Sequence, residues 1–206
     1  MSPRGVIFDL GGVVLGSPMH AIADYEHEVG LPKGVVNRHI VERGRDGAWA
    51  RLERGELETE AFFAAFDAEF AEARRPMSAR DMMTRMGEAT VPREAMIGAI
   101  ARIRAAGLSA AALTNNWRGE GDGTSLLEPH FDVFVESAVL GIRKPDPRIY
   151  AHVLDEMQLR AEEAVFLDDI GRNLKPAREM GMHTIKVDDP DSALAELERV
   201  LGLELR

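Results

Sequence analysis

The apolar positions near the amino terminus form one short, continuous run that ends at an acid. Val6, Ile7 and Phe8 stand together in the stretch GVIFDLGGVV and are β-branched or aromatic. Such a run predicts a strand buried on both faces. Asp9 follows at once, which places a carboxylate at the carboxyl end of the strand, where open α/β sheets bind their ligands. Taken alone, an Asp in this position is more often the cap of the next turn.

Four further short apolar runs follow in the second half of the chain. They are LSAAALT (108–114), DVFVES (132–137), AVFLD (164–168) and HTIKV (183–187). Helical patterns lie between them, the clearest being the stripe Ile149, Tyr150, Val153, Leu154 and Met157. Short apolar strands that alternate with helices predict βαβ units and a parallel sheet. The fold class expected is α/β, with a Rossmann-like three-layer core built on a parallel sheet.

The stretch between the first and second predicted strands indicates helices only. One of these helices carries an aromatic stripe at helical spacing, which we interpret as core packing: Phe62, Phe63, Phe66 and Phe70. The next helix leads back to the sheet, with Pro92 in its first turn and Gly107 as its stop. We therefore expect a core of residues 1–16 and 89–206, and an α-helical insertion at 17–88.

Composition narrows the class of protein. A chain of 206 residues holds one domain, or one domain with a modest insertion. The absence of cysteine excludes disulfides, thiolate zinc sites and thiol nucleophiles. No apolar run reaches the length of a membrane span and the amino terminus lacks a signal-peptide layout, so a cytoplasmic protein with no membrane partner is expected. The net charge of −10 argues against a nucleic-acid binder. The oligomeric state stays open.

Polar residues stand at the carboxyl ends of the predicted strands. They are Asp9, the run Thr114-Asn115-Asn116, and the pair Asp168-Asp169, with Lys144 in a loop between them and Asn173 one turn further on. In a parallel sheet these ends meet at one edge, which would bring three carboxylates together. Three buried acids repel one another unless a cation joins them, and an all-oxygen ligand set favours Mg²⁺. A nearby lysine suits a phosphate group. The pattern predicts an anion site built on a metal.

Four segments resemble the motifs of the haloacid dehalogenase superfamily, and specifically its Mg²⁺-dependent phosphatases. In chain order they are VIFDLGGV, LTNN, RKPDPRIY and FLDDIGRN, and the resemblance covers essentially the whole length. The stretch VFLDDIGRNLKPAREMGMHTIKV is similar to the phosphatase-type domain of soluble epoxide hydrolases and to the related domain of acyl-CoA dehydrogenase fusion proteins. The resemblance implies a hydrolase that acts on a small phosphorylated metabolite, and it identifies the insertion at 17–88 as the cap domain of this family.

The resemblance also implies roles for single residues. Asp9 would be the nucleophile that forms an aspartyl-phosphate, and Lys144 would orient it and offset charge. Asp9, Asp169 and the carbonyl of Gly11 would ligate Mg²⁺, with Asp168 nearby or acting through water. The remaining groups would hold the phosphate or support the site: Thr114, the backbone amide of Asn115, Asn116, and Asn173 as a brace for the fourth motif.

One position departs from the family's pattern. Phosphatases of this family usually carry a second Asp two residues after the nucleophile as their general acid, and this chain has Gly11 there. General acid catalysis contributes about 10²–10⁴ in rate. Three accounts remain open. The acid comes from elsewhere, such as His20 or another cap residue, substrate or water; the preferred leaving groups need no proton; or the protein is a module that binds phosphorylated ligands with little turnover.

Other chemistries on this fold fit less well. A 2-haloacid dehalogenase lacks the paired acids, so Asp168-Asp169 argue against it. A phosphonatase needs a cap lysine, and Lys33 is expected to be a solvent-facing loop residue. The stretch WRGEGDGTS lacks the ending of a P-loop, so a mobile loop is expected there, with Trp117 and Arg118 as candidate contacts. Further cap candidates are expected to be exposed at the surface: Arg43, Arg45, Trp49 and Arg51.

Overall fold

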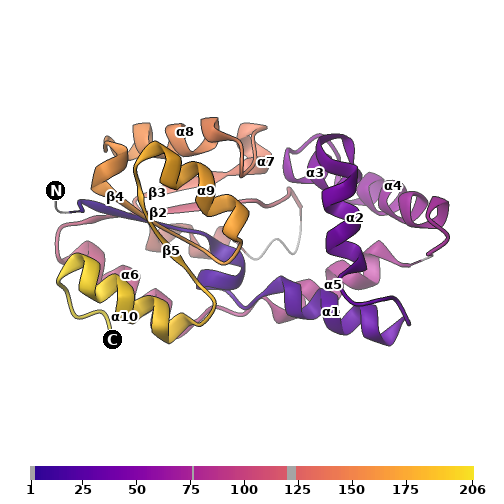
Figure 1. Ribbon diagram of the computed structural model, residues 1–206, viewed down its shortest axis with the longest axis horizontal. Helices are drawn as coiled ribbons and strands as arrows, with labels where there is room; N and C mark the ends of the chain where they lie inside the picture. The colour runs from indigo at the N-terminus through magenta and orange to yellow at the C-terminus, as the bar shows by residue number, and fades with distance from the viewer. Residues whose placement is uncertain (1–2, 76, 120–123) are drawn as a thin grey trace.

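A five-stranded parallel sheet forms the centre of the protein (Figure 1). The computed structural model describes residues 3–75, 77–119 and 124–206. The strands are β1 (Gly5–Phe8), β2 (Ser109–Thr114), β3 (Val133–Glu136), β4 (Ala164–Asp168) and β5 (His183–Lys186). Their order in the sheet is β3-β2-β1-β4-β5, and all four neighbouring pairs are parallel. The predicted α/β class is confirmed, and the first apolar run forms the central strand.

Helices cover both faces of this sheet, which gives three layers (Figure 1). Val6 and Phe8 of β1 pack in the cluster that holds the apolar residues of α6 and α10, whereas Ile7 packs in the cluster of α8 and α9. Successive strand residues point to opposite faces, so a strand covered on both sides is apolar throughout. The core helices are α6 (Glu94–Ala105), α7 (Ser137–Leu140), α8 (Pro147–Met157), α9 (Gly171–Met180) and α10 (Pro190–Leu201).

Five helices between β1 and α6 form a second body with its own apolar centre. They are α1 (Pro18–Glu28), α2 (Val35–Arg43), α3 (Ala48–Glu53), α4 (Thr59–Glu72) and α5 (Ala79–Ala89). Phe62, Phe66 and Phe70 of α4 are fully buried there, as predicted for the aromatic stripe. Phe63 is only partly buried, and the guanidinium of Arg80 lies over its ring at 4.5 Å. Short helical turns complete the chain at Leu10–Val14, Gly44–Asp46, Ser125–His130 and Ala161–Glu163.

The two segments that join these bodies lie side by side. Leu15 and Pro92 form an antiparallel bridge, and the amide of Gly16 donates to the Val91 carbonyl at 2.9 Å. A Cβ on Gly16 would lie 2.1 Å from the Ala89 carbonyl oxygen, so the close approach requires glycine. The expectation that Pro92 opens a helix is wrong. Its bridge keeps the chain extended, and α6 begins two residues later.

No helix in the described ranges is both long and apolar enough to cross a membrane.

Candidate active site

Three carboxylates meet where the central strands end. Phe8 pairs with Leu167 in the sheet register, so Asp9 and Asp168, the next residues of each strand, lie beside one another. One carboxylate oxygen each from Asp9, Asp168 and Asp169 lies within 4.8 Å of the others. The structure therefore brings together the acids that the sequence predicted to converge.

Lys144 joins two of these acids. Its Nζ lies 2.8 Å from Asp9 Oδ1 and 2.8 Å from Asp168 Oδ2, and the lysine is only 1% exposed. Burial alone would lower the pKa of Lys144, but the charges of Asp168 and Asp9 outweigh it and hold this pKa above its ordinary value. The side chain is therefore an ammonium ion held between two carboxylates.

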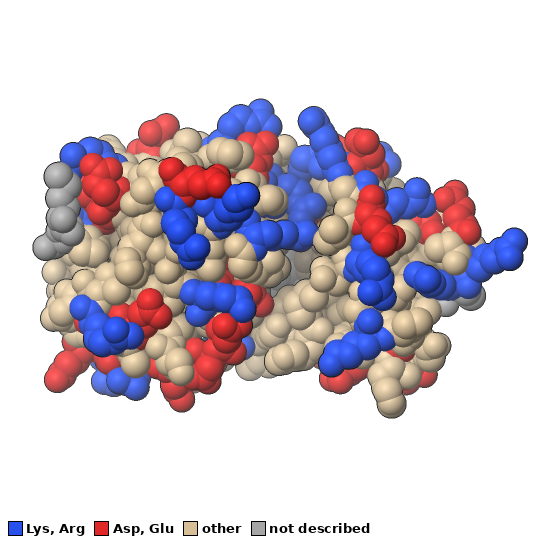
Figure 2. Space-filling model, in the orientation of Figure 1, with Lys and Arg blue, Asp and Glu red and all other residues tan. Residues whose placement is uncertain are grey.

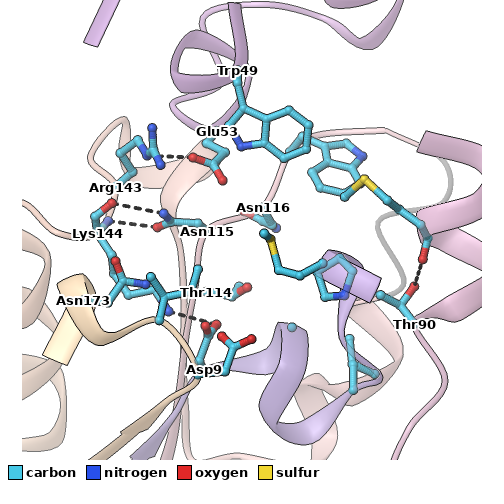
Figure 3. Close-up of a pocket in the computed structure, with 18 of the residues that line it drawn as sticks. Asp9, Trp49, Glu53, Thr90, Thr114, Asn115, Asn116, Arg143, Lys144 and Asn173 are labelled. Carbon is cyan, nitrogen blue, oxygen red and sulfur yellow. Dashed lines mark hydrogen bonds and ion pairs between the residues drawn. The ribbon is translucent and has the colours of Figure 1, made fainter. Parts of the chain in front are cut away.

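The amide of Asn115 holds the lysine's backbone in place (Figure 3). Asn115 Nδ2 donates to the Lys144 carbonyl at 3.1 Å, and the Lys144 amide donates to Asn115 Oδ1 at 2.8 Å. These two bonds tie the end of β2 to the loop before α8. The side chain of Asn115 thus positions Lys144, and the backbone amide of Asn115 remains the group predicted to bind phosphate.

Asp168 is held from three sides and is fully buried. Asn173 Nδ2 lies 3.1 Å from both of its oxygens, the Ile170 amide donates to Oδ1 at 2.7 Å, and Lys144 occupies Oδ2. Asn173 stands in the first turn of α9 and reaches back to the strand that precedes it. These contacts suit a carboxylate that orients the lysine and contacts a bound metal only indirectly. Asn173 holds Asp168 in place, and its role in the reaction stays a prediction.

Asp169 is the acid of the three that Lys144 and Asn173 do not contact in these hydrogen bonds. Its Oδ1 is buried without a hydrogen-bond partner, and burial, followed by the charge of Asp168, raises its pKa to about 6. Gly12 lies against it with φ of +78°, and a Cβ at Gly12 would be 2.1 Å from Asp169 Oδ2. Three acids with one ammonium leave an excess of negative charge, so this all-oxygen set fits a hard divalent cation such as Mg²⁺.

Magnesium is expected to stabilise the folded protein through Asp169. Saturating Mg²⁺ should raise the melting temperature, since a ligand at about 100 times its Kd contributes about 2.7 kcal/mol. Asp169→Asn should melt higher than wild type in EDTA, because it removes a buried, repelling charge, yet should lose the rise with Mg²⁺. Thermal unfolding with EDTA and with Mg²⁺ measures both effects. Asp188→Asn, a change at an exposed acid, should keep the full Mg²⁺ shift. An undiminished shift in Asp169→Asn would contradict the assignment.

The amide-rich end of β2 contributes the other polar wall. Thr114 is 3% exposed, and both it and Asn115 line the same cavity as Asp9. Asn116 also lines this cavity, but its Nδ2 donates to Glu136 at 2.5 Å and its backbone amide donates to Ser137 Oγ at 3.0 Å. The side-chain amide of Asn116 therefore connects β2 to β3, while its predicted role in substrate binding stays a prediction.

Away from the three acids, the cavity wall is mostly apolar, and much of it comes from the helical insertion. It includes Leu15, Pro18, Met19, Ile22, Ile40, Trp49, Met86 and Trp117. The expectation that Trp49 is exposed is wrong, since the residue is 8% exposed and packs against the rings of Phe62 and Phe66 at 5.8 and 5.9 Å. Arg43 and Arg45 are exposed as expected.

Two charged residues that the sequence did not single out line the cavity on the side opposite Asp9 (Figure 3). Glu53 comes from α3, and Arg143 precedes Lys144; Arg143 Nε lies 2.6 Å from Glu53 Oε2. Glu53 lies in the charge-rich run ARLERGELE, where no pattern marks it, whereas Arg143 is the first residue of the motif RKPDPRIY, in which only Lys144 was given a role. Arg172 of α9 lines the cavity as well. Figure 2 shows basic side chains around the groove between the two bodies.

Other candidates lie elsewhere. His20 is exposed on α1 and is not part of the described cavity wall, and Lys33 is exposed as expected. Trp117 does line the cavity, and Arg118 is exposed, its carbonyl accepting from the Thr59 hydroxyl at 3.2 Å. Residues 120–123 of the glycine-rich stretch, where a mobile loop was expected, lie outside the described residues.

The chain belongs to the haloacid dehalogenase-like hydrolases. The model of that family matches residues 3–181. Acyl-CoA dehydrogenase family member 10 of Mus musculus is 41% identical over 99% of this chain, and bifunctional epoxide hydrolase 2 of Sus scrofa is 36% identical over 100% of it. The chain spans only 20% and 40% of those two proteins.

Phosphatases are among the relatives of this enzyme. Sesquiterpene phosphatase astK of Aspergillus oryzae is 25% identical, with 97% of each chain covered. A family enzyme from Bacteroides thetaiotaomicron, solved in complex with magnesium and inorganic phosphate, shares the fold with a TM-score of 0.64, at 19% identity over 90% of this chain and 94% of the other.

Proposed function

We propose that this hydrolase is a Mg²⁺-dependent phosphatase that cleaves a phosphate monoester through an aspartyl-phosphate on Asp9. The observation that carries the proposal is the buried Lys144, held 2.8 Å from both Asp9 and Asp168 beside the open oxygen of Asp169. Asp9, Asp169 and the Gly11 carbonyl would hold the metal, with Asp168 behind them. When bound, the metal offsets the charge of the phosphate and of the acids around it.

The contacts of Asp9 prepare it for attack. The Leu10 amide, at 2.7 Å, and Lys144 Nζ both hold Oδ1, so Oδ2 is the oxygen that these contacts leave for attack on phosphorus. Thr114 and the backbone amide of Asn115 would hold phosphate oxygens at the same strand edge. Lys144 would keep the nucleophile aligned and stabilise the negative charge that gathers on phosphorus.

The cavity wall suits an alcohol with an apolar part. The phosphate end is polar, whereas the wall beyond it carries two tryptophans and several aliphatic side chains. Such surfaces favour apolar groups because contact removes them from water. The name of the A. oryzae relative, a sesquiterpene phosphatase, is in keeping with such a substrate. We propose a small phosphorylated metabolite whose organic part packs against Trp49, Trp117 and Ile22.

The two bodies would divide this work. Residues 1–16 and 89–206 would form the catalytic core, and residues 17–88 would form a cap that supplies most contacts to the organic part. The chain passes between these two parts beside the bridge of Leu15 and Pro92, and these paired segments would be suited to a hinge. Closing the cap would exclude water from the reacting groups.

Phosphate release from aryl and alkyl phosphates, with Mg²⁺ and with EDTA, tests this proposal. Turnover that requires both Mg²⁺ and Asp9 is the expected result, with faster release from apolar than from sugar phosphates. Gly11 gives weight to one alternative, a module that binds phosphorylated ligands without turnover. That alternative predicts binding of Mg²⁺ and phosphate by calorimetry, but no release from any ester. Release that persists in EDTA would contradict the metal-dependent mechanism.

A further inference from the structure

One acid on the cavity wall has no part in the chemistry proposed so far. Among the described residues that line the cavity, the acids are Asp9, Asp169 and Glu53, and no histidine or tyrosine stands among them. Asp9 is the proposed nucleophile and Asp169 the proposed metal ligand. Glu53 is therefore the one carboxyl of this wall that has no role at the phosphate end.

Glu53 occupies the cap side of the cavity. It is the last residue of α3, lies opposite Asp9 across the cavity in Figure 3, and its side chain is 9% exposed. In-line attack by Asp9 drives the leaving oxygen away from the core, so that oxygen departs toward the cap. Glu53 is on the side where a proton is needed.

The position of Glu53 relative to the core is well defined. Gly55, two residues later, lies so close to α7 that a Cβ there would be 2.3 Å from the Ala138 carbonyl oxygen. Trp49, one helical turn before Glu53, donates a side-chain hydrogen bond to its carboxylate. Arg143 Nε forms an ion pair with Oε2 at 2.6 Å. The carboxyl group is thus held in place at the wall of the cavity that Asp9 also lines.

We propose that Glu53 is the general acid and base of this enzyme, in place of the acid that is missing at Gly11. This assignment rests on the phosphatase function proposed above. As Asp9 Oδ2 bonds to phosphorus, the bond from phosphorus to the ester oxygen breaks, and that oxygen takes the proton of Glu53 and leaves as the alcohol. The Glu53 carboxylate then takes a proton from water as the water oxygen attacks phosphorus. Phosphate and the Asp9 carboxylate are released, and Glu53 is protonated again.

The electrostatic surroundings of Glu53 are compatible with both halves of this cycle. Burial raises its pKa, against the opposing effects of Arg143, the Trp49 hydrogen bond, Arg172 and Lys144. A raised pKa keeps a protonated fraction at higher pH than an exposed glutamate would have. After Glu53 has given its proton to the leaving oxygen, Arg143 stabilises the Glu53 carboxylate until the attacking water protonates it again.

The test compares two esters of similar size with different leaving groups. Benzyl phosphate releases an alkoxide that needs a proton, whereas 4-nitrophenyl phosphate releases a stable phenolate. The parameter to compare is kcat/KM, which reports the departure of the leaving group and not the later hydrolysis of the aspartyl-phosphate. For Glu53→Gln, kcat/KM with Mg²⁺ should fall about 10²-fold or more on benzyl phosphate, and the loss on 4-nitrophenyl phosphate should be smaller by at least about tenfold. Wild-type kcat/KM on benzyl phosphate should also decline as pH rises through the pKa of Glu53, and Glu53→Gln should lack this decline.

A second variant separates catalysis from structure. Gly11 has ordinary backbone angles, and a Cβ there meets nothing nearer than Pro18 Cγ at 3.5 Å, so Gly11→Asp can be accommodated. Adding Gly11→Asp to Glu53→Gln should raise kcat/KM on benzyl phosphate at least about tenfold above that of Glu53→Gln. Glu60→Gln, the same change at an exposed cap glutamate, should alter neither rate.

Three results would overturn the assignment. Equal losses of kcat/KM on both esters would make Glu53 a structural partner of Arg143, and an unchanged kcat/KM on benzyl phosphate would leave it no part in proton transfer to the leaving group. Absence of any turnover by the wild type that requires Mg²⁺ and Asp9 would refute the phosphatase function itself, and the role of Glu53 with it. The phosphatase function is tested with wild type and Asp9→Asn alone. Its failure can therefore be distinguished from failure of the role proposed for Glu53.

Discussion

Asp9→Asn is expected to lower phosphate release by more than about 10³-fold, because an amide cannot form the acyl phosphate through which the reaction would pass. The substitution is nearly isosteric. The Leu10 amide and Lys144 Nζ both contact Oδ1, which the Asn side-chain oxygen can replace. Burial raises the pKa of Asp9 well above its ordinary value, so its charge costs the folded state free energy at neutral pH. In EDTA the variant should therefore fold and melt no lower than wild type.

Phosphate release under saturating Mg²⁺, together with thermal unfolding, checks this prediction. Asp155→Asn makes the same change at an exposed position on α8 and should keep the wild-type rate. If Asp9→Asn retained more than a tenth of the wild-type activity while folded, Asp9 would not be the nucleophile.

Lys144→Ala is expected to lower turnover by several orders of magnitude and also to destabilise the fold. The ammonium is the shared partner of Asp9 and Asp168, which are 7% and 0% exposed. Removing one partner of a buried ion pair typically costs about 3–5 kcal/mol, because the other charge remains without compensation. Mg²⁺ should recover part of this stability, since it supplies positive charge to the same acids.

Kinetics of Lys144→Ala must therefore be measured at saturating Mg²⁺ and at a temperature where circular dichroism shows a folded protein. Lys175→Ala, at a lysine on α9 whose side chain is 77% exposed, should change neither rate nor melting temperature measurably. A folded Lys144→Ala variant with less than a tenfold loss would show that the lysine neither aligns the nucleophile nor stabilises charge in the transition state.

The strands and the acid cluster were predictable because both depend on local pattern and on simple geometry. A strand covered on both faces must be apolar throughout, so the run from Val6 to Phe8 was recognisable in isolation. Parallel strands end at the same edge, and Asp9 and Asp168 each stand at the end of neighbouring strands. Their convergence follows from the register of the sheet and needs no knowledge of side-chain packing.

Residues of the cap were not predictable in the same way. Trp49 was expected at the surface, yet it lines the cavity because α3 packs against the phenylalanines of α4. His20 follows the first motif closely in sequence, but it is exposed on α1. The inward face of each cap helix depends on how five helices pack together, and helical periodicity does not say which neighbour a stripe will meet.

The sequence by itself determined the fold class, the family and the convergence of three acids at one edge of the sheet, because these depend on residue types at fixed places along strands and turns. Only the tertiary structure decided which residues of the helical insertion line the cavity, and it brought Glu53 and Arg143 together at the cavity wall, 2.6 Å apart. Those two residues are distant in the chain, one at the end of α3 and the other in the loop before α8. Their contact is set by the bridged segments at Leu15 and Pro92 and by the close approach of Gly55 to α7.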